Sequence, residues 1–276
     1  MAAQFARTLR ENSTAAVILG IDAAWTEAGS TGVAVIAYNG HRTRLVSAAA
    51  SYRSFCDMAR SKRYVEENLK SQRPDIGELL DAAMLLTDMN VNVVAIDMPM
   101  SRLAFSSRRE ADDRISKCFG RYNASTHSPN AVRPGAFGRW MTEEFVSRGF
   151  PLTTELAQAR SPALVEVYPH VALIQLMRCE ERRRYKVHNS KKYWDSTSIP
   201  ERIALLLNEW HCIIAALKAE IEDVDLHLPE TFSTLAAMKA YEDCLDAIIS
   251  AWVGLQFFLG KATPYGDNNA AIWVPN

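Results

Sequence analysis

Acidic side chains end or interrupt three apolar runs that have the pattern of buried strands. The first run ends at Asp22, the second ends at Asp97, and the third, Ala163–Tyr168, carries Glu166 in its middle. If these strands are parallel neighbours, the acids gather at one end of the sheet, where open α/β folds bind their ligands. We therefore expect a carboxylate-rich site at that end of the sheet.

A helical segment near the C-terminus adds Asp243 and Asp246, which are three residues apart and so share one helix face. Apolar residues surround Asp246, and a buried carboxylate without a partner is costly or takes up a proton. Because gathered acids repel one another, a divalent cation is the simplest way to keep them ionised, and oxygen ligands favour Mg²⁺ or Mn²⁺. Two such ions about 4 Å apart would activate a water molecule and stabilise the leaving oxygen in phosphodiester cleavage.

Each acid also has a simpler explanation when it is taken alone. A strand-ending residue such as Asp22 can cap a helix or form a turn. Glu166 can form a salt bridge with one of the many arginines, and Asp243 can be a solvated acid on a helix surface. The combination of acids at matching strand and helix ends carries the prediction.

Two basic segments could flank these acids, although the whole chain has 31 Lys and Arg against 32 Asp and Glu. Residues 101–139 hold eight basic and three acidic side chains, and residues 178–192 hold seven and two. We expect Arg109, Arg114 and Lys186 to contact the phosphates of a nucleic acid. A solvated helix face around Glu180–Arg184 is the simpler explanation of the second segment. The near-zero net charge excludes a protein that coats nucleic acid nonspecifically.

The elements that must position these residues can be predicted in chain order. Apolar, β-branched runs predict three antiparallel strands over Ala15–Ile21, Gly32–Tyr38 and Thr43–Ala50, and Asn39–Gly40 predicts a hairpin between the last two. The other predicted elements are a helix over Ser71–Asn90, strands over Val91–Ile96 and Ala163–Tyr168, helices over Val171–Met177, Ile199–Ala219 and Thr234–Leu259, and an edge strand over Ala270–Pro275. This order calls for a mixed sheet with helices on its faces.

The compartment follows from cysteine usage and from the N-terminus. Five widely spaced cysteines form no CxxC pair, which indicates a reducing compartment and no zinc site. Charges in Met1–Glu11 exclude a secretory signal, so we expect a cytoplasmic protein. The longest apolar stretch, Cys244–Leu259, is too short and too polar to cross a membrane.

Six short motifs, in this order and spacing, resemble an uncharacterised family of predicted ribonuclease H-like nucleases, the domain of unknown function 429. They are Gly20-Ile-Asp-Ala-Ala-Trp25, Ala95-Ile-Asp-Met-Pro99, Arg109-x-x-Asp112, Glu166-Val-Tyr-Pro169, Asp246-Ala-Ile-Ile-Ser-Ala251 and Ile272-Trp-Val-Pro275. The similarity spans residues 17–275.

The resemblance implies an α/β, ribonuclease H-like fold, with a mixed five-stranded sheet in which three antiparallel strands precede parallel ones. It implies one domain over residues 1–276, with a core at about 15–98, 163–177 and 234–275, a long insert at 101–160 and a helical insert at 178–230 in a helical C-terminal third. It also implies metal-binding roles for Asp22, Asp97 and Asp246, with Asp243 as a fourth ligand. Related junction-resolving nucleases usually carry Glu where this chain has Asp97, which leaves the number of metal ions open.

We therefore expect a nuclease that uses Mg²⁺ or Mn²⁺ and acts on nucleic acid, with Asp22, Asp97 and Asp246 as catalytic acids and Asp243 or Glu166 completing the shell. The sequence leaves a homodimer open. One alternative is an ATP-binding phosphotransferase of the actin and sugar-kinase type, which shares the core fold but needs a glycine-rich phosphate loop. The other is a non-catalytic binding protein on the same fold.

Overall fold

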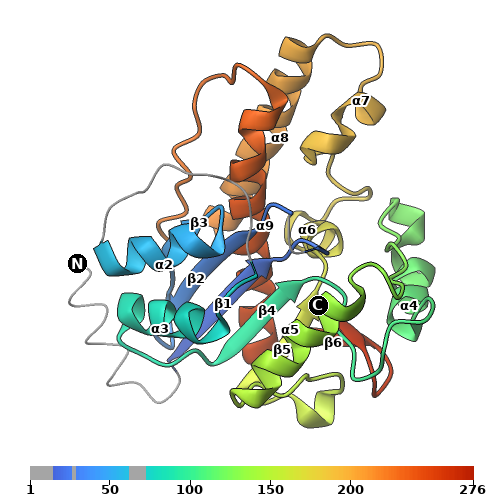
Figure 1. The fold of residues 1–276 in the computed structure, drawn as a ribbon. Coiled ribbons are helices and arrows are strands. Elements are labelled where there is room, and N and C mark those ends of the chain that lie inside the picture. The colour runs from blue at the N-terminus through green and yellow to red at the C-terminus, as the bar shows by residue number, and fades with distance from the viewer. Residues whose placement is uncertain (1–14, 27–28, 62–72) are drawn as a thin grey trace.

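The structure is a computed structural model that describes residues 15–26, 29–61 and 73–276 (Figure 1). The N-terminal residues on which the predicted localisation depends lie outside these ranges, as do Ser71 and Gln72 at the start of a predicted helix. No helix within the described ranges has the length and apolarity needed to cross a bilayer.

A mixed sheet of seven strands, in the order β3-β2-β1-β4-β5-β7-β6, forms the centre of the described chain (Figure 1). The strands are β1 (Ala16–Asp22), β2 (Gly32–Tyr38), β3 (Thr43–Ala49), β4 (Val93–Asp97), β5 (Ala163–Val167), β6 (Ala262–Gly266) and β7 (Ala271–Pro275). β1, β2 and β3 are antiparallel neighbours, whereas β1, β4, β5 and β7 run parallel to one another. The predicted antiparallel-then-parallel arrangement and the hairpin after Tyr38 are confirmed.

The prediction of five strands is wrong, because β7 and β6 extend the sheet beyond β5. β7 was expected at the edge, but it lies between β5 and β6. β6 pairs antiparallel with β7 and forms the edge itself. It contains Pro264, which an edge strand tolerates because one side of its backbone has no strand to bond to.

Helices cover both faces of the sheet. They are α2 (Tyr52–Ser61), α3 (Ile76–Thr87), α4 (Glu110–Phe119), α5 (Gly135–Ser147), α6 (Pro169–Met177), α7 (Ser190–Tyr193), α8 (Ile199–Lys218) and α9 (Leu235–Phe258). Apolar residues of α2, α3 and α5 pack on one face, and those of α6, α8 and α9 pack on the other. α2 was not predicted, although its buried residues Tyr52, Phe55, Cys56 and Ala59 have helical spacing.

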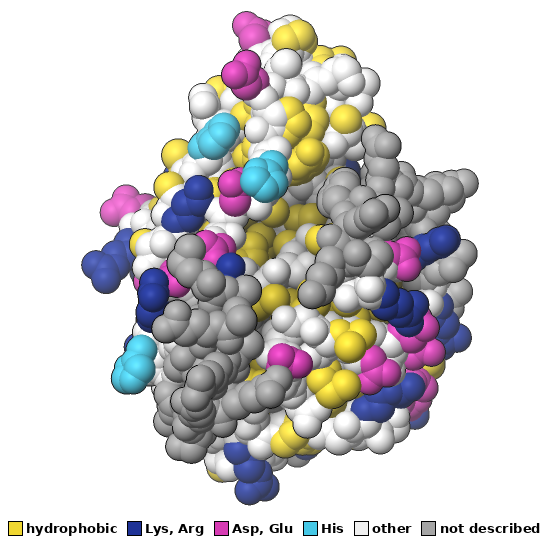
Figure 2. Space-filling model, turned by 90° about the vertical axis from the view of Figure 1, so that its left-hand side faces the viewer, with side chains coloured by type: hydrophobic (Ala, Val, Ile, Leu, Met, Phe, Trp, Pro, Cys, Tyr) yellow, Lys and Arg dark blue, Asp and Glu magenta, His cyan; other side chains and the backbone are white. Residues whose placement is uncertain are grey.

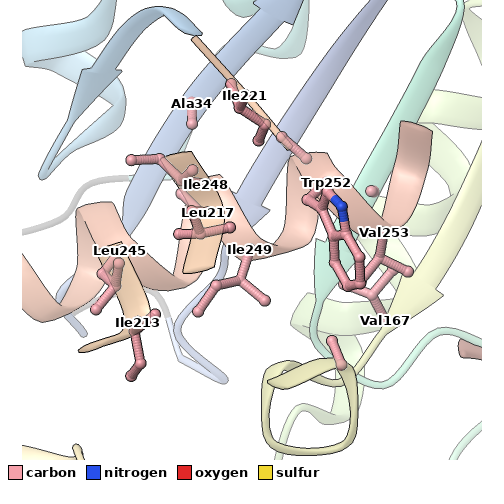
Figure 3. Packing of buried hydrophobic residues seen from close by; sticks show 14 of the residues in the cluster. Ala34, Val167, Ile213, Leu217, Ile221, Leu245, Ile248, Ile249, Trp252 and Val253 are labelled. Carbon is pink, nitrogen blue, oxygen red and sulfur yellow. The ribbon is translucent and has the colours of Figure 1, made fainter. Parts of the chain in front are cut away.

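Helix α9 packs directly against the sheet and also contacts α8. Figure 3 shows Leu245, Ile248 and Ile249 of α9 beside Ile213 and Leu217 of α8. On the sheet side the approach depends on glycine: a Cβ atom on Gly32 would lie 1.9 Å from the carbonyl oxygen of Asp243. This close packing fixes the acidic face of α9 against the ends of β1 and β2.

Candidate acidic site

Asp22 and Asp97 are the last residues of two parallel neighbouring strands. They are register partners across β1 and β4, so their side chains leave the sheet at the same edge. Both side chains are partly buried, and neither forms a salt bridge with any residue in the described ranges. The predicted gathering of these two acids is confirmed.

Helix α9 brings three further carboxyl groups to this edge: Glu242, Asp243 and Asp246, all fully or almost fully buried. Gly32, which pairs with Asp22 across β1 and β2, packs on the backbone of Asp243 and places the two acids side by side. The solvated helix-surface position considered for Asp243 is therefore wrong. Glu242 had been overlooked in the sequence, although it is one residue from Asp243.

Two lysines contact the acids of α9. The ammonium group of Lys186 is bonded to Oδ2 of Asp246 and lies 4.0 Å from Oε1 of Glu242. Lys239 contacts Oδ1 of Asp243 and donates to Oε1 of Glu242 at 2.8 Å. Lys239 was not predicted as a site residue; its spacing of three and four residues from these acids on one helix was the available signal.

A short segment, Tyr185–Val187, holds Lys186 in place. The Tyr185 hydroxyl donates to Oδ1 of Asp246 at 2.6 Å, and the backbone N–H of Val187 donates to Glu242. The indole N–H of Trp210 in α8 donates to the Tyr185 carbonyl at 2.9 Å. Residues 178–186 are not helical, so the expected solvated helix face around Glu180–Arg184 is wrong.

The acids of the site outnumber the lysines that pair with them in the described residues, and the pKa values of several acids are raised. Burial raises the pKa of Asp22 to about 7; Lys186 opposes this rise and Asp243 adds to it. Burial likewise raises the pKa of Asp246 to about 6, again opposed by Lys186. Burial and then the charge of Asp22 raise the pKa of Asp97 well above its ordinary value. Among the described residues, five carboxyl groups thus face two ammonium groups.

The donor chemistry suits a hard divalent cation, because all the donors are carboxylate oxygens. Oδ2 of Asp243 is buried and has no hydrogen-bond partner among the described residues, so it can accept a further ligand. Within the described ranges, no three Asp, Glu, His or Cys side chains are grouped as ligands of one metal ion. The site therefore has suitable donors and excess negative charge, while lysines already neutralise part of it.

Glu166 lies in a separate network beside this site. Both of its oxygens accept from Arg109, at 2.7 Å, which confirms the salt bridge considered from the sequence. Arg109 also bonds Asp112 and the carbonyl of Met100, so all five of its guanidinium N–H groups are used. The structure thus gives Arg109 a part in holding Glu166 and leaves no N–H of its guanidinium for a phosphate.

This network lines one side of a pocket of about 50 Å³ that also contains Asp97, Trp25, His127 and Tyr168. Burial raises the pKa of Tyr168, Asp97 adds to the rise and Arg182 opposes it, so both charges lie near the Tyr168 ring. Arg182 was not singled out from the sequence. Arg114, in contrast, pairs at 2.8 Å with Glu110 on the exposed surface of α4.

Fold and site together define an α/β protein with a carboxylate-rich site where β1, β4 and α9 meet. A family described as "Protein of unknown function (DUF429)" matches residues 20–270, so the chain belongs to that family. Neither the curated proteins nor the solved structures contain a match to the chain.

Proposed function

We propose that this protein is a metal-dependent nuclease with a ribonuclease H-like fold. The observation that carries the proposal is the convergence of Asp22 and Asp97 with Asp243 and Asp246 at the carboxyl ends of parallel strands. The strand order from β3 to β5, with three antiparallel strands followed by parallel ones, supports the ribonuclease H-like assignment.

Asp22 and Asp97 are the residues best placed to hold Mg²⁺ or Mn²⁺, because no Lys, Arg or His side chain among the described residues forms a salt bridge with them. Asp243 offers Oδ2, which has no hydrogen-bond partner among the described residues. Asp246, which is bonded to Lys186, adds negative charge to the site. A divalent ion bound there would lower the pKa of a coordinated water and stabilise charge on a phosphate.

The residues around the pocket would bind and orient the substrate. Arg182 makes no ion pair within the described residues, and its charge reaches Tyr168, so it can contact a phosphate near Asp97. Arg114 is half-exposed, and its surface pair with Glu110 is weak enough to exchange for a phosphate. Arg109 would act indirectly, by fixing Glu166 and the backbone that follows Asp97.

The basic groups form no broad patch on the face drawn in Figure 2, where Lys and Arg alternate with Asp and Glu among the described residues. We expect a substrate to be held by a few local contacts near the acids. This fits the near-zero net charge of the chain and predicts a modest dependence of binding on salt.

The test is cleavage of a panel of single-stranded, duplex, branched and RNA–DNA hybrid substrates in Mn²⁺. The wild-type protein should cleave at least one of them, and Asp22→Asn or Asp97→Asn should each lower the rate at least about a hundredfold. Asp195→Asn, at an exposed acid outside the site, is the matched control and should retain activity. Cleavage that survives Asp22→Asn cannot come from this site.

A non-catalytic binding protein is the second candidate, and the pairing of Lys186 and Lys239 with the acids of α9 favours it. A protein whose acids are neutralised internally would show no divalent-ion affinity even at millimolar concentration. Titration with Mn²⁺ separates the two candidates. Micromolar binding of ATP with Mg²⁺ would instead indicate the phosphotransferase alternative.

A further inference from the structure

Lys186 occupies a central position among the acids. Its side chain is 13% exposed and is bonded to Asp246. Among the influences on the carboxyl groups of Asp22, Asp97 and Asp246, its positive charge is the largest that lowers their pKa. One ammonium group therefore lies near acids from β1, β4 and α9 at once.

The protein holds this ammonium group firmly. Tyr185 and Val187, the residues on both sides of Lys186, bond Asp246 and Glu242. Trp210 of α8 bonds the Tyr185 backbone from the other direction. These contacts tie the segment around Lys186 to α9 and α8, and the bond to Asp246 holds the ammonium group itself within the site.

Lys186 and Lys239 form salt bridges with the acids of α9 but not with Asp22 or Asp97. Both oxygens of Asp246 are occupied, one by the Tyr185 hydroxyl and one by Lys186. Asp22 and Asp97 have no salt-bridge partner among the described residues, and Oδ2 of Asp243, fully buried beside Asp22, has no hydrogen-bond partner. The unsatisfied oxygen atoms therefore lie on the Asp22 side of the site.

We propose that the Lys186 ammonium is a resident cation that takes the place of a second metal ion, so that the site binds one divalent cation, held by Asp22 and Asp97. This inference rests on the proposed metal-dependent function and specifies its metal content. Removing the Lys186 charge frees Oδ2 of Asp246 and opens a second cation position.

The experiment counts bound Mn²⁺ by isothermal titration calorimetry and by the electron paramagnetic resonance signal of free Mn²⁺. It uses the full chain as wild type, Lys186→Ala, Lys186→Arg and Lys191→Ala, the last being an exposed lysine outside the site. We expect one Mn²⁺ for the wild type, Lys186→Arg and Lys191→Ala. We expect two for Lys186→Ala, with the first bound at least about tenfold more tightly because a nearby positive charge is gone.

Two Mn²⁺ ions in the wild type overturn this inference and leave the nuclease proposal standing, as does a single Mn²⁺ of unchanged affinity in Lys186→Ala. No Mn²⁺ in the wild type overturns both proposals. One Mn²⁺ with no cleavage of any substrate supports the inference and refutes the nuclease. If circular dichroism shows that Lys186→Ala does not fold, the counts for the wild type and Lys186→Arg decide: one ion in each supports the inference, and two in either overturns it.

Discussion

Replacing Arg109 with methionine removes the only positive charge from the buried network that it forms with Asp112 and Glu166. The three side chains are 9%, 1% and 4% exposed, and Arg109 donates five N–H groups within the protein. Methionine replaces the aliphatic stem of arginine and lacks its charged guanidinium group. The substitution therefore leaves two carboxyl groups buried without a cation.

We expect Arg109→Met to lower the free energy of unfolding by about 3–5 kcal/mol at neutral pH, the usual cost of removing one partner of a buried ion pair. For a chain of this size, the melting temperature should fall by roughly 10 °C. Burial already raises the pKa of Glu166, and Arg109 opposes that rise, so the pKa should rise further in the variant. A group whose pKa is raised on folding stabilises the fold at low pH and loses that contribution as pH rises through the folded value, so the defect should shrink on acidification.

Thermal unfolding followed by circular dichroism at about pH 5 and about pH 8 measures both effects. Arg114→Met is the matched control, because Arg114 forms its ion pair with Glu110 on the surface of the adjoining helix α4. It should change the free energy of unfolding by less than about 0.5 kcal/mol. Equal losses for the two variants, or a loss in Arg109→Met that does not depend on pH, would refute the assigned role of the network.

Three further predictions concern the contacts that build the site and its neighbourhood. Gly32→Ala should lower the free energy of unfolding, measured by chemical denaturation, by at least about 3 kcal/mol, because its Cβ would lie 1.9 Å from the Asp243 carbonyl oxygen. Gly260→Ala is the control: there is open space around Gly260, but its φ is +68°, so the loss should be only about 1 kcal/mol. Similar losses for the two variants would contradict the close packing at Gly32. Burial raises the pKa of Asp22 from 3.8 to about 7, so in metal-free protein the contribution of Asp22 to stability should be lost as pH rises through about 7. Asp22→Asn should remove this contribution, up to about 4 kcal/mol, from the difference in stability between acidic and neutral pH, and an unchanged pH profile would refute the raised pKa. Ser198→Ala removes the N-cap of α8 and should lower the free energy of unfolding by about 1 kcal/mol. Hydrogen exchange of the backbone amides in the first turn of α8 should become faster, and unchanged exchange would refute the role of the cap.

Local chemistry made much of the sheet predictable. Asn39–Gly40 predicted the β2–β3 hairpin, because this dipeptide adopts the turn that joins twisted antiparallel strands. Asp22 and Asp97 end apolar runs that have the pattern of central strands, and the pairing of β1 with β4 brings them together. β6 was not predicted, because its short sequence contains Pro264 and Gly266 and is typical of a loop. The pairing of β6 with β7 makes this segment a strand.

The cation partners of the acids could not be predicted, because they come from distant segments. Lys186 precedes Asp246 by 60 residues and belongs to a charge-rich stretch that resembles a solvated helix. Tyr185 beside it is fully buried, because it packs with α8 and α9, which come from other parts of the chain. The burial of Asp243 likewise depends on Gly32, a residue whose spacing along the chain carries no sign of that contact.

The position of a bound divalent ion tests the central claim most directly. Crystals of the wild-type protein soaked in Mn²⁺ should show an anomalous difference peak within about 2.2 Å of carboxylate oxygens of both Asp22 and Asp97. Asp22→Asn crystals treated in the same way should lose this peak. A wild-type crystal in which Mn²⁺ binds elsewhere, or leaves Asp22 and Asp97 without a metal contact, would contradict the account.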